Sequence, residues 1–374
     1  MDLDGNNLFG SLPSTLVNLV DLTRLDLSDN SILGTIPESY SLFTSLQVFN
    51  LSKNGLNGTL PDMANFTNLT MLDVSSNKLS GTIPSFMFAQ SIQEIRMQVN
   101  AFNSTIPTEL ASLTQLTTLL LNSNQLNGTI PPGLFYGSLI NLALSSNQLT
   151  GTFPSNNSVI HLQRLLLSDN QLNGTLPDLT APNLIHLDLS HNLEFSGRIP
   201  SSLASPNLRI LILASTKISG TIPGVLYTYN LTYMDVRSAS LIGTLPSSFG
   251  PLQYFNMGWN SPPGLTGTIP STLVVTSHLK YLQLSSNRLI GTIPSSILYL
   301  TSCTLLHLSG NSLNGTIPSE FYSLSQLVEF EVANNQLSMN FNHEFGRLSS
   351  LWILDLRGNS ITGEIPSEIG SLSY

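Results

Sequence analysis

The sequence predicts an α/β solenoid, a right-handed superhelix of about sixteen repeats with a parallel β-sheet along its concave side. Three observations lead to this prediction. A unit of 23–24 residues recurs along the whole chain, each unit contains the apolar–polar alternation of a short strand, and most units then carry an asparagine, a glycine and a proline at fixed offsets. We therefore expect residues 1–374 to form a single domain, because no linker or charge block interrupts the repeats.

Each unit begins with a segment that predicts a strand. The unit reads Leu-x-x-Leu-x-Leu-x-x-Asn-x-Leu-x-Gly-x-Ile-Pro, as seen over residues 116–131. Alternation directs leucines such as Leu119 and Leu121 inward and the residues between them outward. A single unit cannot bury its own apolar face, so successive strands are expected to stack in parallel.

An asparagine follows each strand, where the chain turns away. Because an amide both donates and accepts hydrogen bonds, we expect this column to satisfy backbone groups of its own and adjacent turns. Two units depart from the pattern, with Thr216 and Ala239 at this position. The asparagines are Asn6, Asn30, Asn54, Asn77, Asn100, Asn124, Asn147, Asn170, Asn192, Asn260, Asn287, Asn311, Asn335 and Asn359.

The Gly-x-Ile-Pro segment marks the next corner, and a loose helical stretch should return from it to the next strand. The residue between glycine and isoleucine is a threonine in twelve units. This row of hydroxyl and methyl groups has two interpretations: an ordered flank that binds ice or a crystalline polysaccharide, or ordinary strand packing after repeat duplication. The threonines are Thr35, Thr59, Thr82, Thr105, Thr129, Thr152, Thr175, Thr221, Thr244, Thr268, Thr292 and Thr316.

These residues resemble the plant-type leucine-rich repeat proteins, whose marker is the Gly-x-Ile-Pro half of the unit, here for example Gly81 with Pro84. The resemblance covers essentially the whole chain. It implies a non-enzymatic, extracellular or cell-surface recognition module, similar to the ectodomain of a receptor-like kinase or receptor-like protein in signalling or defence. Polygalacturonase inhibitors share the scaffold, so an inhibitor of a cell-wall-degrading enzyme is an alternative.

Extracellular members of that family usually carry disulfide-bonded caps at both ends. This chain starts inside a repeat at Met1 and ends inside one at Tyr374, so its first and last repeats are incomplete and uncapped. We therefore expect a fragment of a longer protein. No signal peptide opens the chain and no apolar stretch approaches the roughly 18 residues of a membrane span, which leaves open a membrane anchor in a full-length parent.

Charge and cysteine content exclude several partners. The chain has 13 basic and 22 acidic residues and no basic run, which argues against a nucleic-acid partner. The one cysteine, Cys303, excludes an internal disulfide and a cysteine-based zinc site, and its place at a leucine position predicts a buried hydrophobe.

A ligand site is predicted on the outward strand positions of the later repeats. Early repeats carry mostly small or amide side chains there, whereas Tyr233, Tyr254 and Tyr281 occupy one column in three successive repeats, about 4.8 Å per step. Such a ladder suits a peptide, protein or glycan ligand, although tyrosine also simply favours strands. The candidate contacts are His186, Asp188, Tyr233, Asp235, Arg237, Tyr254, Asn256, Trp259, Tyr281, Gln283 and His307.

Asn-x-Ser/Thr sequons fit a surface in the secretory pathway. Asn50 is the most informative, because it faces outward from its strand and a glycan there would obstruct the early part of the sheet. The predicted glycosylation sites are Asn50, Asn57, Asn65, Asn68, Asn103, Asn127, Asn156, Asn173, Asn230 and Asn314.

Catalysis has little support in the sequence. His186, Asp188 and His191 lie close together, but alternation aims only the first two along one face, and His191 enters the turn. No phosphate loop, nucleophile elbow or paired-carboxylate motif occurs. The sequence therefore predicts no catalytic residue, no cofactor and no metal site.

Overall fold

The structure is a computed structural model that describes residues 1–84, 86, 89–153, 159–247, 249–272 and 278–372. The chain groups into two compact units, residues 1–194 and 195–374, which are described separately. That all 374 residues act as one domain stays a prediction.

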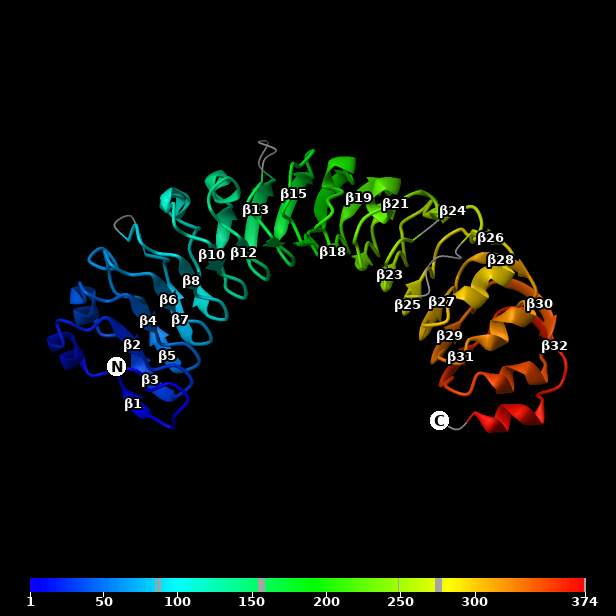
Figure 1. Ribbon diagram of the computed structural model, residues 1–374, viewed down its shortest axis with the longest axis horizontal. Coiled ribbons are helices and arrows are strands. Elements are labelled where there is room, and N and C mark those ends of the chain that lie inside the picture. Colours follow the sequence, from blue (N-terminus) through cyan, green and yellow to red (C-terminus); the bar gives the residue numbers. More distant parts are fainter. Residues whose placement is uncertain (85, 87–88, 154–158, 248, 273–277, 373–374) are drawn as a thin grey trace. The chain divides into compact units, whose positions relative to one another are not determined.

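In the first unit, each repeat contributes a three-residue strand to a parallel inner sheet, which lies on the concave side of that unit (Figure 1). Strands adjacent in the sheet come from successive repeats, and their first residues align, as Thr118 does with Asn141. The strands are β2 (Arg24–Asp26), β4 (Val48–Asn50), β6 (Met71–Asp73), β8 (Glu94–Arg96), β10 (Thr118–Leu120), β12 (Asn141–Ala143), β14 (Arg164–Leu166) and β16 (His186–Asp188).

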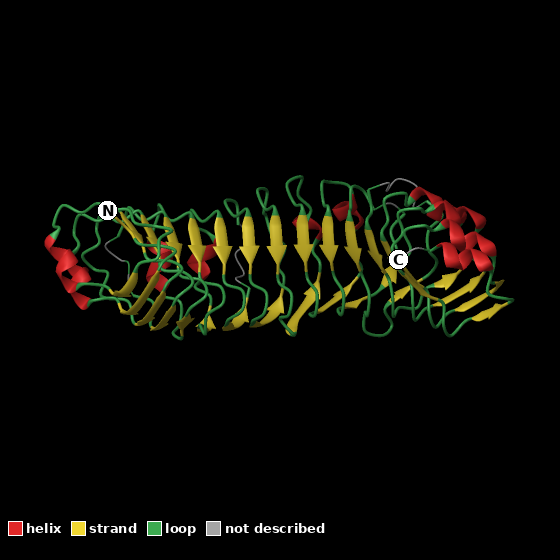
Figure 2. Cartoon of the chain, turned by 90° about the horizontal axis from the view of Figure 1, so that it is seen from below, coloured by secondary structure: helices red, strands yellow, loops and turns green. Residues whose placement is uncertain are grey.

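A second row of parallel strands runs along the flank of the first unit and carries the threonine positions (Figure 2). It comprises β1 (Phe9–Ser11), β3 (Ser31–Thr35), β5 (Gly55–Gly58), β7 (Lys78–Gly81) and β9 (Ala101–Phe102), then β11 (Asn127–Thr129), β13 (Gln148–Thr152) and β15 (Gln171–Thr175). The helical turns of this unit are η1 (Ser14–Asn18), η2 (Glu38–Leu42), η3 (Thr108–Ser112) and η4 (Pro132–Phe135).

The second unit repeats the arrangement. Its inner sheet consists of β18 (Ile210–Ile212), β20 (Tyr233–Asp235), β23 (Tyr254–Asn256), β25 (Tyr281–Gln283), β27 (Leu305–His307), β29 (Glu329–Glu331) and β31 (Ile353–Asp355). Its flank strands are β17 (Glu194–Arg198), β19 (Lys217–Gly220), β21 (Ser240–Leu241), β22 (Gly243–Thr244), β24 (Leu265–Thr266), β26 (Ile290–Gly291), β28 (Ser312–Gly315), β30 (Gln336–Asn340) and β32 (Ser360–Thr362). The helical turns are η5 (Ser201–Leu203), η6 (Gly224–Tyr227), η8 (Ser295–Tyr299), η9 (Ser319–Ser323), η10 (His343–Arg347) and η11 (Ser367–Ser371).

The return segments are 3-10 turns of three to five residues. All of them except η10, which follows Asn342, start directly after the corner proline, as η3 does after Pro107, whose φ of −60° suits the entry to a turn. None of the helices that the structure describes has the length and apolar character needed to cross a membrane.

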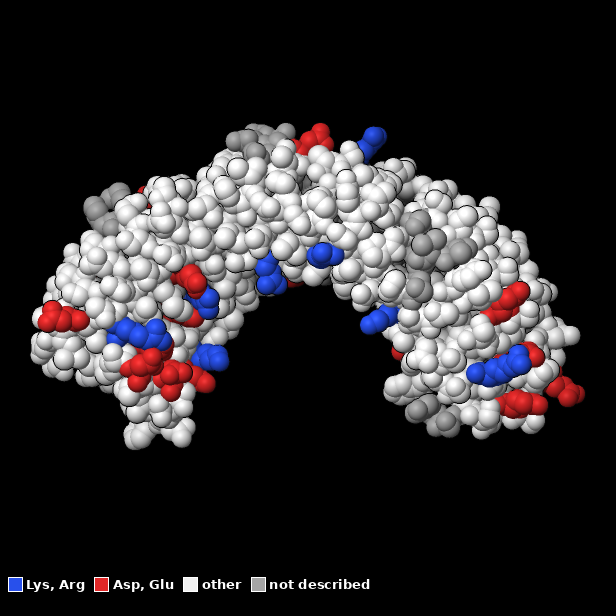
Figure 3. Space-filling view, in the orientation of Figure 1, with Lys and Arg blue, Asp and Glu red and all other residues white. Residues whose placement is uncertain are grey.

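Leucines of the strand segments fill the interior, as the alternation predicts. Leu119, Leu121, Leu142 and Leu144 are all 0% exposed. Cys303 is likewise buried at its leucine position, which confirms its interpretation as a small hydrophobe. Charged side chains are sparse over the visible surface (Figure 3), so packing of leucine layers between neighbouring repeats is the main source of stability.

The asparagine column forms the hydrogen-bond ladder that the sequence predicts. Asn170 Nδ2 donates to the carbonyls of Leu144, Leu167 and Ser168 at 3.0, 3.2 and 3.1 Å, and its Oδ1 accepts from the Leu149 N–H at 3.0 Å. One side chain therefore joins backbone groups of its own repeat to those of the preceding one.

The two substituted positions weaken the ladder inside the second unit. Thr216 replaces the amide with a hydroxyl that donates to the Leu213 carbonyl at 2.8 Å. Ala239 has no side-chain donor or acceptor at all. Fewer contacts between repeats are therefore made at these two turns.

Along the flank, most of the threonines lie against the glycine of the next repeat. Gly151 has a φ of +88°, and a Cβ added to it would lie 2.8 Å from the Thr129 γ-methyl. The methyl thus packs directly over a residue that has no side chain, which is why glycine and threonine recur together.

Candidate functional site

The tyrosine column of the second unit is a continuous stack of rings. Strands β20, β23 and β25 align Tyr233, Tyr254 and Tyr281 in register. The ring centroids of Tyr233 and Tyr254 are 4.1 Å apart with an interplanar angle of 6°, and those of Tyr254 and Tyr281 are 4.3 Å apart at 4°. The predicted ladder is therefore confirmed, and we call these three residues the tyrosine ladder.

The stacking determines what the ladder presents to a ligand. Both faces of the Tyr254 ring are covered by its neighbours, so the ring edges and hydroxyl groups are what a ligand meets. All three side chains are half-buried. Burial is the main cause that raises the pKa of Tyr281 to about 12, and the neighbouring Tyr254 adds to this effect. Burial also raises the pKa of Tyr233. The hydroxyls of Tyr233 and Tyr281 therefore stay protonated at any physiological pH.

An open depression of about 360 Å³ lies along the ladder. Besides the tyrosines, it is lined by Ile210, Thr232, Gln253 and Lys280. Lys280 is exposed and makes no ion pair within the part of the chain that the structure describes. These four residues are missing from the predicted site. Thr232, Gln253 and Lys280 each directly precede a ladder tyrosine in the sequence, which is the signal that could have identified them.

A row of buried polar side chains lies beside the ladder. Its members stand two residues after the ladder tyrosines on β20, β23 and β25, and at the end of the next strand, β27. Asp235, Asn256, Gln283 and His307 are 4%, 0%, 2% and 9% exposed. Asn256 Oδ1 accepts from the Gly258 N–H at 3.1 Å, and its Nδ2 donates to the Tyr254 hydroxyl at 3.3 Å. These four residues are among the predicted contacts, but their burial suits a role in supporting the ladder.

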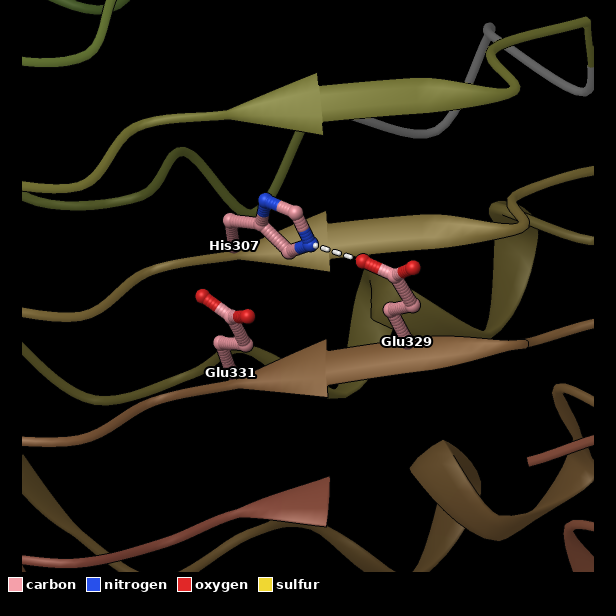
Figure 4. Close-up of side chains that lie close together, drawn as sticks. All are labelled: His307, Glu329 and Glu331. Carbon is pink, nitrogen blue, oxygen red and sulfur yellow. Dashed lines mark hydrogen bonds and ion pairs between the residues drawn. The ribbon is translucent and has the colours of Figure 1, made fainter. Parts of the chain in front are cut away.

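His307 ends this buried row, and its hydrogen bonds assign one tautomer to the neutral ring; Figure 4 shows its contact with Glu329. The Ser285 N–H donates to Gln283 Oε1 at 2.7 Å, so the amide nitrogen of Gln283 is the group that faces His307 Nδ1 at 3.0 Å. An amide nitrogen only donates, so Nδ1 accepts. The proton of the neutral ring then lies on Nε2, which donates to Glu329 Oε2 at 3.1 Å.

The same residues, with Glu331, are close enough to suggest a metal site. One ligand atom each of His307, Glu329 and Glu331 lies within 4.8 Å of the others. A metal at Nε2 would need a lone pair on that nitrogen, and the hydrogen bond from Gln283 leaves the proton there. The distances between these ligand atoms fit an ion, but the position of the His307 ring proton on Nε2 does not.

Two other predicted contacts lie apart from the depression. Arg237 Nε is 3.7 Å from Asp235 Oδ2 and leaves 40% of its side chain exposed. Trp259 occupies the turn after β23 with a φ of 54° and is 48% exposed, but it does not line the depression.

His186 and Asp188 belong to the first unit, on β16. Asp188 Oδ1 accepts from the N–H and the hydroxyl of Ser190 at 3.0 and 2.6 Å. Both ring nitrogens of His186 are buried without a hydrogen-bond partner, and burial, with a smaller effect of Arg164, lowers the pKa of His186 against the opposing effect of Asp188. His191 lies in the following turn with a φ of 56°, as predicted.

Most sequon asparagines are exposed. Asn57, Asn65, Asn68, Asn103, Asn127, Asn173, Asn230 and Asn314 lie on the surface, and Asn156 lies outside the described residues. Asn50 is half-buried, and its Nδ2 donates to Asp26 and Ser28 on the preceding repeat. A glycan on Asn50 would require these hydrogen bonds to rearrange. Glycosylation at all ten positions stays a prediction.

The twelve threonines of the flank are all exposed. Where a glycine follows in the next repeat, the threonine methyl packs on it, as Thr244 does on Gly267, and the hydroxyl is left to solvent. Among the described residues these hydroxyls have no protein partner.

Comparisons with known proteins agree with this architecture. The family model described as Leucine Rich Repeat matches residues 21–43, 68–89, 115–136, 161–181, 183–205, 278–300, 302–324 and 350–372. No curated protein sequence matches the chain.

Solved structures of plant receptors resemble the chain along nearly its whole length. The Arabidopsis receptor kinase HAESA, in complex with the peptide hormone IDA and the co-receptor SERK1, is 32% identical with a TM-score of 0.90, covering 99% of this chain and 64% of that one. The HAESA ectodomain with an N-terminally extended IDA peptide is 30% identical with a TM-score of 0.83, covering 99% of this chain and 68% of that one. The plant peptide hormone receptor RGFR1, in complex with RGF2, is 30% identical with a TM-score of 0.87, covering 99% and 64%. This chain thus spans less than two thirds of the length of the RGFR1 chain and of the first HAESA chain.

One further solved structure is more distantly similar to the chain. A plant ice-binding protein is 26% identical with a TM-score of 0.50, covering 66% of this chain and 74% of that one.

Proposed function

Because the chain belongs to the leucine-rich repeat family, we propose that it is a non-enzymatic, extracellular recognition module that binds a peptide along the tyrosine ladder. The observation that carries this proposal is the closed stack of Tyr233, Tyr254 and Tyr281 beside an open depression that also holds Lys280. The exposed sequons and the ectodomain similarity support a place outside the cell.

The geometry favours a peptide over a glycan. Aromatic side chains that bind sugars use their ring faces, and here both faces of Tyr254 are occupied by other rings. A row of ring edges and hydroxyls instead offers apolar contact and hydrogen bonds to an extended backbone with side chains. HAESA and RGFR1 are described in complex with peptide hormones, which supports the same ligand class.

The ladder is also rigid before a ligand arrives. Asn256 holds the Tyr254 hydroxyl, and Tyr281 contacts the His307 ring edge to face, with centroids 5.9 Å apart. Preorganised aromatic anchors lose little entropy on binding, so each contributes more of its contact energy to affinity. Receptor signalling through a partner protein is part of the proposal, and the ladder is its ligand-binding element.

Display of a random peptide library tests this function. Peptides selected by the wild-type chain should bind Tyr254→Ala about thirtyfold more weakly, because loss of an aromatic anchor commonly costs about 2 kcal/mol. Tyr299→Ala is the matched control, since Tyr299 is 42% exposed on η8 and away from the depression. Tyr254→Phe should keep the stack and most of the affinity. Undiminished binding by Tyr233→Ala, Tyr254→Ala and Tyr281→Ala alike would refute the site.

The threonine flank supports a second candidate function, binding to ice or a crystalline polysaccharide. The observation that favours it is the row of exposed hydroxyls whose methyls are held on glycines, together with the similarity to an ice-binding protein. Replacing Thr221, Thr244 and Thr268 by valine separates the two functions. Loss of adsorption to ice or cellulose with normal peptide capture would assign a surface-binding function to the flank.

A further inference from the structure

A second depression lies on the inner sheet of the first unit. It has a volume of about 420 Å³ and spans β8 to β14. Leu120, Ala143 and Leu166 contribute an apolar floor, and Arg96 and Arg164 stand at its two ends. Arg96 and Arg164 are three steps apart across the sheet and, because Arg96 aligns with Leu166, two residues apart along the strand, so their backbones are separated by about 16 Å.

The charge of this depression is opposite to that of its surroundings. Residues 1–194 contain five Lys or Arg and fourteen Asp or Glu, so the first unit carries the whole formal net charge of −9. Two of the five basic residues line this one depression, and no carboxylate lines it among the described residues, although Glu94 pairs with Arg96. The depression is therefore more basic than the rest of this acidic unit, which favours anions at this place.

Both arginines retain hydrogen-bond donors for a ligand. Arg96 Nη2 donates to Glu94 Oε2 at 2.6 Å, but its Nε is buried without a partner. Arg164 is exposed and makes no ion pair or side-chain hydrogen bond within the described residues. Since a guanidinium has five N–H donors, each group keeps the capacity to bind a carboxylate.

A third arginine of the same sheet shows the contrasting case. Arg24 is the first residue of β2, as Arg164 is of β14, but it is bound by Asp2 at 3.0 Å and Asp26 at 2.8 Å. The chain therefore binds Arg24 with two of its own carboxylates, whereas Arg96 is paired with one, Glu94, and Arg164 with none among the described residues.

We propose that this depression is a subsite for an acidic peptide segment, in which Arg96 and Arg164 each bind one carboxylate and the apolar floor holds the side chain between them. An extended chain places residues i and i+4 on the same face about 13 Å apart, and the long side chains of the two arginines can cover the difference from their backbone separation. The motif that fits is acidic-x-apolar-x-acidic. The inference rests on the proposed function in taking the ligand to be a peptide.

The test is an NMR titration of the full chain with acetyl-Glu-Ser-Leu-Ser-Glu-amide in about 20 mM salt, where charge attraction is weakly screened. The Nε–Hε signals of Arg96 and Arg164 should shift on addition of the peptide, and that of Arg24 should not. Arg96→Gln and Arg164→Gln should each weaken binding about tenfold, the loss expected for a charge-assisted hydrogen bond. Arg24→Gln should change the affinity less than twofold.

Two further peptides and two further variants make the result decisive. The uncharged peptide acetyl-Gln-Ser-Leu-Ser-Gln-amide should bind at least tenfold more weakly than the glutamate peptide. So should acetyl-Glu-Leu-Glu-Ser-Ser-amide, which has the same charge but a shorter spacing between its two carboxylates. Arg96→Lys and Arg164→Lys retain the charge and check that the fold survives. Equal affinity for the two glutamate peptides, or unchanged affinity of both glutamine variants, would overturn the subsite.

This experiment is independent of the tyrosine ladder. Tyr254→Ala should leave this titration unchanged. A failed titration with tyrosine-dependent peptide capture intact would therefore remove only the anion subsite, and the reverse result would remove only the proposed ladder function.

Discussion

Replacing one asparagine of the asparagine column should show how strongly neighbouring repeats are joined. Asn170 is 8% exposed and makes four hydrogen bonds of 3.0 to 3.2 Å. Its amide nitrogen has only two hydrogens for three carbonyls, so Asn170→Ala removes about three effective bonds. At about 1 kcal/mol each, the three lost bonds, one of which leaves the Leu149 N–H unpaired, should cost about 3 kcal/mol in total.

Hydrogen exchange is the suitable assay, because a long repeat array need not unfold in one step. The Leu149 amide should exchange about 150-fold faster in Asn170→Ala, the factor that corresponds to 3 kcal/mol. Asn173→Ala is the matched control, since Asn173 is exposed and outside the ladder, and it should cost less than about 0.5 kcal/mol. Equal protection of Leu149 in both variants would refute the structural role assigned to the ladder.

The raised pKa values yield two further predictions. Burial and Tyr254 raise the pKa of Tyr281 from 10.0 to about 12. The neutral side chain therefore contributes fully to stability below pH 10, and this contribution is lost as the pH rises through 12. Titration of the absorbance near 295 nm should show this late ionisation, and Tyr281→Phe should remove it. Burial likewise raises the pKa of the Cys303 thiol to about 12, so iodoacetamide at pH 8 should leave it unmodified by mass spectrometry until urea is added, whereas rapid labelling of the native chain would contradict its burial.

Periodicity alone was sufficient to predict the fold. The 23–24-residue unit, the inward leucines and the asparagine column each depend on local spacing, which the sequence displays directly. The ladder of Tyr233, Tyr254 and Tyr281 was predictable for the same reason, because parallel strands in register place equivalent positions side by side. The 3-10 form of the return segments was not, since a short apolar stretch is compatible with several turn types.

Accessibility was the part of the site that the sequence could not supply. Alternation correctly placed Asn256, Gln283 and His307 on the same side of the sheet as the tyrosines, but they are almost fully buried. The large rings beside them take the outer positions and exclude water from the smaller polar groups. Whether an outward residue is exposed therefore depends on the size of its neighbours in adjacent strands, which repeat-by-repeat comparison does not measure.

The depression between Arg96 and Arg164 was missed for a related reason. The early repeats were characterised by their small and amide side chains, and each arginine is isolated in its own repeat. Only the three-dimensional arrangement shows that small residues between two long basic ones leave a hollow with charged ends. A small side chain is thus as informative as a large one when its neighbours are long.

The ladder of asparagines and the glycine–threonine contacts also bear on how the inner sheet can bind a ligand. Both act outside the inner strands, at the turn and at the flank, and together they hold successive repeats at a constant spacing. The outward residues of the strands are consequently less needed to join the repeats, although some, such as Asn256, support a neighbouring side chain. A stack of tyrosines in one unit and the arginines Arg96 and Arg164 in the other can therefore occur on the same scaffold without destabilising it. Because the spacing is set before binding, a ligand that matches it gains contacts without the cost of ordering the receptor.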